Sequence, residues 1–263
     1  MPDHVVFFSG GVASWATAKR VAATHGTQHL KLLFTDTLIE DPTLYTFLKE
    51  GAINVGGELI TITEGRTPWQ VFRDERMLGN SRVDPCSRVL KREPAQRWIK
   101  STYPRPESVH LYLGLSWDEQ HRLERSQRFW QPYDVSSPLC EPPYLQKNEL
   151  FAWAKSEGLT IPRLYELGFS HNNCGGGCVK AGLSHFRHLL QVLPDVYDEW
   201  ATNEEAIRQH LNKPVTILRY QQNNERHNIT LNELRDKQAD LTPAFDWGGC
   251  GCFSQVDDEI TDA

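Results

Sequence analysis

A glycine-rich turn near the start of the chain has residue types suited to binding an anion. It has the sequence Ser9-Gly10-Gly11-Val12-Ala13-Ser14 and follows a short apolar run at 5–8. Glycines let backbone N–H groups approach a phosphate closely, and a helix that begins here adds unpaired donors and a favourable dipole. With a serine hydroxyl on each side, the turn predicts a phosphate-binding loop. The alternative is a strand-to-helix turn that binds nothing.

Two close pairs of cysteines form a second group with chemical potential. Cys174 and Cys178 enclose three glycines, and Cys250 and Cys252 enclose one. Backbone N–H groups exposed by such loops stabilise thiolates, and we expect nothing bulky beside these sulfur atoms. The pairs therefore predict metal ligands, whereas thiols buried in the core are the alternative. Cys140 fits that alternative well.

The residues alone leave the identity of the metal open. Tetrahedral zinc accepts cysteine pairs at this spacing, and a four-iron four-sulfur (4Fe-4S) cluster accepts four thiolates at mixed spacing. Together with Cys86, the two pairs supply more than four thiolates. Cysteines in a reducing compartment are more often metal ligands or catalytic thiols than disulfides.

The composition is that of an ordinary globular protein, with 39% hydrophobic and 24% charged residues among 263. The net charge of −6 argues against a general nucleic-acid coat, although it leaves room for a local basic groove. No apolar run reaches the roughly 18 residues of a membrane span, and the start lacks the basic region of a signal peptide. We therefore expect a cytoplasmic protein with no membrane partner.

The elements that must position these residues alternate between strands and helices. Such a rhythm predicts an α/β fold with a mostly parallel twisted sheet and helices on both faces. Ligands of such sheets bind beyond the carboxyl ends of the strands, where Ser9, Asp36 and Gly114 fall. The expected strands are 4–8, 30–34, 58–63 and 109–115, and the expected helices are 14–25, 41–50, 69–76 and 89–100.

The pattern changes after Trp130, where helices at 148–158, 182–193 and 203–211 and a late strand at 215–220 are expected. This change predicts a nucleotide-binding core at 1–135, a helical region with the cysteine cluster at 136–255 and an acidic tail at 256–263. Three histidines near the first cysteine pair are expected to be polar surface residues: His171, His185 and His188.

The glycine-rich turn resembles the SGGxDS loop of PP-loop ATP pyrophosphatases. These enzymes include phosphoadenosine phosphosulfate (PAPS) reductases, tRNA thiolation enzymes, 7-cyano-7-deazaguanine synthase and the sulfur-inserting enzyme of DNA phosphorothioation. Ala13 stands where these enzymes usually carry an aspartate. Four carboxylates could substitute for it: Asp36, Glu40, Asp118 and Glu119.

Further segments resemble PAPS reductases in the same order along roughly residues 5–180. One departure is Ser116, which stands where the family usually has an arginine, so the contact to an anionic group could shift to Arg122 or Arg125. The matching segments are Phe34-Thr35-Asp36-Thr37 with Glu40 and Pro42, Cys86 with Lys91, 113–119, Ser137-Pro138-Leu139, Ile161-Pro162 and 164–168, followed by Cys174 and Cys178.

The resemblance implies an adenine nucleotide alpha-hydrolase-like, HUP/Rossmann-like fold that binds ATP and Mg²⁺. The implied nucleotide contacts are Ser9, Gly10, Gly11, Val12, Ser14, Asp36, Gly114 and Arg122, with Trp117 able to stack on a base. The implied catalytic residues are Asp36, Lys91, Asp118, Glu119 and Cys252. Because several sulfur-transferring relatives carry a 4Fe-4S cluster, the resemblance favours that cluster over zinc, with Cys86, Cys174, Cys178 and Cys250 as ligands.

The expected function is therefore that of a sulfurtransferase-like enzyme that activates a substrate by adenylation. The acceptor would be a nucleobase, a nucleic-acid phosphate or a sulfur carrier. One alternative is a thiol reductase that acts on adenylylated sulfate, although the Glu-Cys-Gly-x-His signature of PAPS reductases is absent. Another is a non-catalytic nucleotide-binding module, which Ala13 favours. A homodimer is left open.

Overall fold

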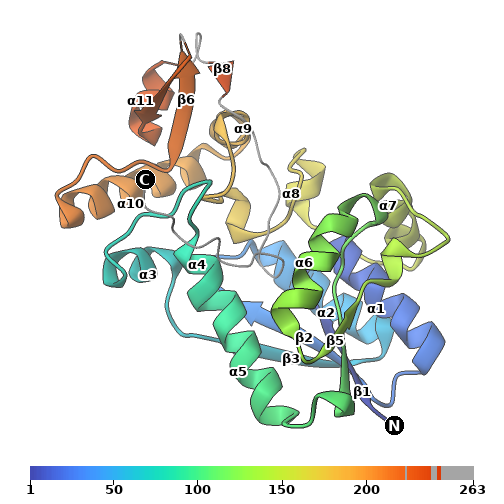
Figure 1. The fold of residues 1–263 in the computed structure, drawn as a ribbon. Coiled ribbons are helices and arrows are strands. Elements are labelled where there is room, and N and C mark those ends of the chain that lie inside the picture. The colour runs from blue at the N-terminus through green and yellow to red at the C-terminus, as the bar shows by residue number, and fades with distance from the viewer. Residues whose placement is uncertain (223, 238–241, 244–263) are drawn as a thin grey trace.

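A five-stranded parallel sheet forms the centre of the molecule in the computed structural model, which describes residues 1–222 and 224–237 and the backbone of 242–243. The strand order is β3-β2-β1-β4-β5, so β2 and β3 lie on one side of β1, and β4 and β5 lie on the other (Figure 1). This order confirms the predicted parallel sheet. The strands are β1 Asp3–Phe7, β2 Leu30–Asp36, β3 Glu58–Thr63, β4 Val109–Tyr112 and β5 Asp134–Ser136.

Apolar residues on both faces of the inner strands explain why these segments are buried in the middle of the sheet. Val5 pairs with Lys31 of β2 and with Leu111 of β4, and its side chain is fully buried. Strands covered on both faces are near-continuous apolar runs, which is the pattern of 5–8 and 30–34. β5 has only three residues, so no periodic signal predicted it.

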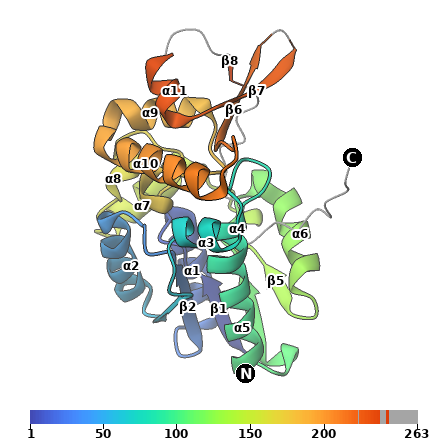
Figure 2. The same cartoon turned by 90° about the vertical axis from the view of Figure 1, so that its left-hand side faces the viewer.

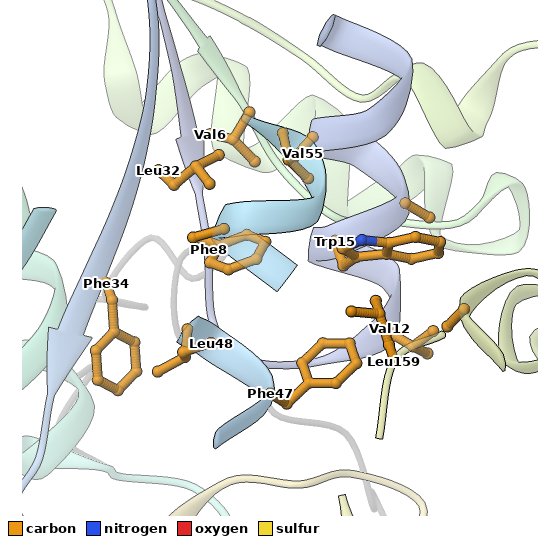
Figure 3. Close-up of a cluster of buried hydrophobic side chains, with 14 of the residues drawn as sticks. Val6, Phe8, Val12, Trp15, Leu32, Phe34, Phe47, Leu48, Val55 and Leu159 are labelled. Atoms are coloured by element: carbon orange, nitrogen blue, oxygen red, sulfur yellow. The ribbon is translucent and has the colours of Figure 1, made fainter. Parts of the chain in front are cut away.

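Helices cover both faces of the sheet. On one face, Val6 and Phe8 pack with Trp15 in a cluster that α1, α2 and α7 complete (Figure 3). On the other face, Val5 and Phe7 pack in a cluster with residues of α5 and α6, and η1 contacts β2. These helices are α1 Val12–His25, α2 Pro42–Val55, α7 Lys147–Ser156, the π-helix η1 Arg88–Arg92, α5 Glu93–Thr102 and α6 Gln120–Trp130.

A second apolar cluster lies over the carboxyl ends of the strands (Figures 1 and 2). It is built from helices and from a small antiparallel sheet of order β7-β6-β8, of which the sequence predicted only one strand. Its elements are α3 Pro68–Asp74, α8 Arg163–Glu166, α9 Leu183–Val192, α10 Pro194–Leu211, α11 Leu231–Asp236, β6 Leu218–Gln222, β7 Glu225–Ile229 and β8 Thr242–Pro243.

Short helical turns connect these parts. They are α4 Pro85–Ser87 and the 3-10 turns η2 Pro106–Ser108, η3 Trp117–Glu119, η4 Pro138–Cys140 and η5 Cys174–Gly176. Four of them carry residues that the sequence singled out: Cys86 in α4, Asp118 in η3, Cys140 in η4 and Cys174 in η5. Among the described residues, no helix combines the length and the apolar character that a membrane span requires.

Candidate nucleotide and cysteine sites

The glycine-rich turn joins β1 to α1 as predicted. Gly10 has a φ of 78°, and Gly11 precedes the helix in an extended conformation. No side chain of the described residues caps this N-terminus, so the N–H groups of the first turn point at the space above the strand. The Ser14 hydroxyl donates to the Gly11 carbonyl at 2.8 Å, which holds the turn in shape.

Gly114 follows β4 and lies directly against this turn. A Cβ atom added to Gly114 would be 2.7 Å from the Ser14 nitrogen and 2.8 Å from the Ser14 Cα. Real side chains do not approach backbone atoms so closely, so only glycine lets the two chain segments pass. This packing explains why position 114 is a glycine, while its role as a nucleotide contact stays a prediction.

A cavity of about 400 Å³ opens above these two segments. It lies beyond the carboxyl ends of β1 and β4, where the strand order reverses, and open α/β sheets bind their ligands at this switch point. Its lining brings together most of the predicted nucleotide contacts with residues of a later segment: Ser9, Gly11–Ser14, Gly114–Glu119, Arg122, Leu145–Lys147, Leu150, Tyr165, Ser170, His171 and Asn173.

Two carboxylates share this cavity with Ala13. The Ser116 hydroxyl donates to Asp118 Oδ1 at 2.5 Å, and its backbone N–H donates to Glu119 Oε2 at 3.1 Å. Arg122 forms an ion pair with Glu119. Of the four carboxylates predicted to replace the missing aspartate, Asp118 and Glu119 therefore line the cavity. Carboxylate oxygens suit Mg²⁺, so the donor set is compatible with the predicted ion.

Lys147 is a cation of this cavity that sequence reasoning missed. Its Nζ donates to the Ser170 carbonyl and lies 5.2 Å from the centre of the Tyr165 ring. Burial lowers the pKa of Lys147. Lys147 is the first residue of α7, and the capping pair Gln146 and Glu149 marks that helix start in the sequence. The helix was predicted one residue short of it.

His171 was predicted to be a surface residue, and this prediction is wrong. It lines the cavity, and its ring stacks on that of His185 at 5.2 Å. Its Nδ1 is buried with no hydrogen-bond partner among the described residues, and burial lowers the pKa of His171 to about 3. His185 and His188 are also partly buried. His185 donates to the Gly176 carbonyl and His188 to the Leu167 carbonyl, each at 2.6 Å.

Asn172 connects this segment to the glycine-rich turn. Its side chain is 1% exposed, and its amide Nδ2 donates to the Gly10 carbonyl at 3.2 Å. Its Oδ1 is buried without a partner among the described residues. Asn172 therefore fixes the turn from outside the sheet, and its unpaired oxygen is ready to accept a hydrogen bond.

Three of the residues predicted to bind the nucleotide or to act in catalysis are not part of the lining of this cavity: Gly10, Asp36 and Lys91. Asp36 accepts hydrogen bonds from the Leu38 N–H and the Tyr45 hydroxyl, both at 2.8 Å. Lys91 lies 3.5 Å from Glu40, whose carboxylate also accepts hydrogen bonds from the Thr37 hydroxyl and the Cys174 N–H. Glu40 thus joins the second strand to the cysteine loop.

The cysteine loop lines a second, smaller cavity of about 30 Å³. Cys86, Cys174 and Cys178 all face it, as the predicted ligand set requires, together with Lys91, Asp84 and Lys180. In the described part of the chain, no three histidine, cysteine or acidic side chains are close enough to hold a metal ion. Cys250 and Cys252 lie outside the described residues.

The glycines between these cysteines do not leave the loop open, contrary to the sequence-based expectation. A Cβ atom on Gly177 would be 2.2 Å from Trp200 Cε2, and one on Gly175 would be 2.7 Å from the Ile39 carbonyl oxygen. The loop is therefore packed tightly, and Cys178 is only 7% exposed. A hydrogen bond with Cys178, followed by burial, raises the pKa of Cys174 well above its usual value. A metal ion would have to displace that proton.

Three further predicted residues lie at or near the rim of the larger cavity. Trp117 lines it, is 40% exposed and has Tyr144 as an aromatic neighbour at 6.0 Å. Arg125 is exposed on α6 and does not line the cavity, so Arg122 is the arginine at this site. Cys140 is half-buried, and its thiol lies 3.4 Å from the Ser116 carbonyl.

A parallel sheet of order 3-2-1-4-5 with helices on both faces is a doubly wound α/β fold. No protein-family model and no curated protein matches the chain. The chain is similar to the crystal structure of phosphoadenylyl-sulfate (PAPS) reductase from Candida auris in a phosphate complex, with a TM-score of 0.48 and 17% sequence identity. The match covers 66% of this chain and 82% of that one. The likeness is one of fold.

Proposed function

We propose that the chain binds ATP in the larger cavity, with the phosphates on the turn from Ser9 to Ser14. The observation that carries this proposal is the coincidence of three features in one place. The turn presents the uncapped N-terminus of α1, the cavity lies at the switch point of the sheet, and Lys147 and Arg122 supply positive charge. Backbone donors, a helix dipole and cations together suit a polyphosphate.

The proposed reaction is adenylation of a substrate. A substrate oxygen attacks the α-phosphorus of ATP, the bond from that phosphorus to the bridging oxygen breaks, and pyrophosphate leaves. Lys147 and Arg122 stabilise the charge that develops on the departing phosphates. Asp118 and Glu119 would hold Mg²⁺, which neutralises phosphate charge when it is bound. Asp36 and Lys91 remain predicted catalytic residues at a distance from this lining.

The proposed second step is sulfur transfer, in which a sulfide-level nucleophile displaces AMP from the adenylated substrate. Cys86, Cys174 and Cys178 line the smaller cavity and supply the thiolate donors that a 4Fe-4S cluster or zinc takes, and they would have to move closer together to hold either. Cys250 would be the fourth ligand and Cys252 the reactive thiol. The proposed acceptor is a nucleobase or a nucleic-acid phosphate.

Ala13 favours a second candidate, a nucleotide-binding module without turnover. It lines the cavity at the position where a carboxylate would otherwise face the phosphates. This candidate predicts ATP binding without pyrophosphate release. A reductase acting on adenylylated sulfate would instead bind PAPS and release no pyrophosphate from ATP.

The test compares two lysines of the same helix. We expect Lys147→Gln to weaken ATP binding about tenfold or more, because it removes a charge-assisted contact to phosphate. Lys155→Gln, on the exposed side of α7, should leave binding unchanged. Titration with a fluorescent ATP analogue measures binding, and a coupled pyrophosphate assay measures turnover.

Equal ATP affinity in both variants and the wild type would show that the nucleotide does not bind in this cavity. Binding without pyrophosphate release, with every candidate acceptor supplied, would favour the non-catalytic module. An absorption spectrum of anaerobically purified protein tests the cluster independently, because a colourless zinc-loaded protein would contradict the iron–sulfur assignment.

A further inference from the structure

The β6–β7 hairpin presents one entirely polar face. Residues paired across an antiparallel ladder lie on the same face, and residues two apart along a strand do too. Arg219 pairs with Asn228 and Gln221 pairs with Arg226, so these four side chains share a face. The opposite face carries Leu218 and Ile229, which belong to the second apolar cluster.

The two arginines of this face are joined by Arg82 from the loop before α4. Arg82 and Arg226 are close enough to Arg219 to act with burial in lowering its pKa. Within the described residues, none of the three has an ion-pair partner, and the Arg219 Nε is buried without a hydrogen bond. Like charges gathered without a carboxylate are unfavourable until an anion joins them.

The side chains beside the arginines indicate what kind of anion fits. Gln221 and Asn228 can donate and accept hydrogen bonds, as groups that contact phosphates, sugars and base edges do. Guanidinium groups bind phosphate in a bidentate manner. All four hairpin side chains of this face are polar, whereas protein partners depend on aromatic and aliphatic anchors. A nucleic acid therefore fits better than an acidic protein.

The position of the face relates it to the thiols. The loop that carries Arg82 continues into Asp84 and Cys86, which line the smaller cavity. Gly79 of the same loop lies close to Val179, another lining residue. A Cβ atom added to Gly79 would be 3.0 Å from Val179 Cγ2. The loop thus lies between the hairpin face and the cysteine cavity.

We propose that Arg82, Arg219 and Arg226, with Gln221 and Asn228, form a docking surface for the phosphodiester backbone of a nucleic acid. Its use as a substrate-binding surface rests on the proposed function, because it names nucleic acid as the acceptor class. The surface itself depends only on the arginines and the hairpin register.

The test measures binding of a fluorescein-labelled DNA duplex, and of its single strand, by anisotropy over a range of salt concentrations. We expect Arg226→Gln and Arg82→Gln each to weaken binding about fivefold to tenfold near 0.1 M salt. Each should lower the slope of log K against log salt by about 1. Arg105→Gln, an exposed arginine before β4, should change neither quantity.

Equal losses in Arg105→Gln and the hairpin variants would overturn the surface, as would unchanged binding in Arg226→Gln and Arg82→Gln. Competition by poly-glutamate as effective as that by unlabelled DNA would replace the nucleic acid with an acidic protein. ATP titration of the same variants separates the two proposals. If ATP binds but DNA binding does not depend on the arginines, only the docking surface is contradicted. If DNA binding depends on the arginines but ATP does not bind, only the nucleotide site is contradicted.

Discussion

Ala13 gives the glycine-rich turn no carboxylate of its own, and two carboxylates of η3 line the same cavity. Glu119 is already bound to Ser116 and Arg122. Asp118 is the more exposed of the two, and only the Ser116 hydroxyl is shown to donate to it. Asp118 is therefore the carboxylate freer to bind a cation in this cavity.

Asp118→Asn should leave ATP affinity within about twofold while pyrophosphate release falls by about 10²-fold. The reason is that an amide keeps the hydrogen bond to Ser116 but cannot stabilise a metal-bound transition state. A single-turnover assay measures the release. Asp134→Asn, at the opposite end of the sheet on β5, serves as the control. Parallel losses of binding and release would show that Asp118 acts in binding alone.

Individual residues of the site were predictable where chemistry and local sequence coincide. Ser9 and Gly114 follow strand ends, Arg122 was indicated by the resemblance, and the structure brings all three to one cavity. Lys147 and His171 were missed, because neither lies at a strand end. They reach the cavity only when the segment after β5 folds back over the sheet, and a single sequence does not contain that tertiary contact.

The glycines of the cysteine loop suggested one structural role in the sequence and have another in the fold. They suggested exposed backbone for a metal, yet Gly177 lies against Trp200 of α10, and the loop helps to close the second apolar cluster. Packing of this kind is invisible in the sequence, because Trp200 is distant along the chain. In contrast, β1 and β2 were predictable from apolar runs and β3 from its alternating, β-branched sequence, while the polar β7 has no such signal.

Gly177→Ala should destabilise the protein by about 1–3 kcal/mol, because the new methyl group overpacks the Trp200 ring. Denaturant unfolding measures the change. The double variant Gly177→Ala/Trp200→Leu should lose less than the sum of the two single variants, since the smaller side chain makes room for the methyl group. Strict additivity would show that the glycine serves something other than this contact.

On the scale of the whole molecule, titratable histidine side chains are buried at both ends of the sheet. At the amino end, His4 stacks on His25 at 4.0 Å and bonds to the Tyr112 hydroxyl at 2.8 Å. Burial is the first cause that lowers the pKa of His4 and of His110, with neighbouring histidines adding to it. At the carboxyl end, burial lowers the pKa of His171 to about 3.

These lowered pKa values predict loss of stability in mild acid. Below about pH 6.5 the unfolded chain binds protons that the folded histidines reject, so the free energy of unfolding falls as the pH drops. The fall is at most about 1.4 kcal/mol per pH unit and per histidine. For His171 it continues down to about pH 3.

Denaturant unfolding at a series of pH values between about 7 and 5 tests this expectation. His171→Gln should flatten the dependence, whereas substitution of the exposed His121 by glutamine should leave it as in the wild type. A dependence in His171→Gln as steep as that of the wild type would assign the acid sensitivity to other groups.

Asn172 is the amide that holds the Gly10 carbonyl, and it stands two positions before Cys174, whose own N–H is held by Glu40. The cysteine loop and the glycine-rich turn are therefore linked through residues 172–174. If ATP binds to the turn as proposed, oxidation or metal loading that shifts these residues changes the affinity for ATP. Thermodynamic reciprocity then requires the nucleotide to bias the state of the thiols by the same factor.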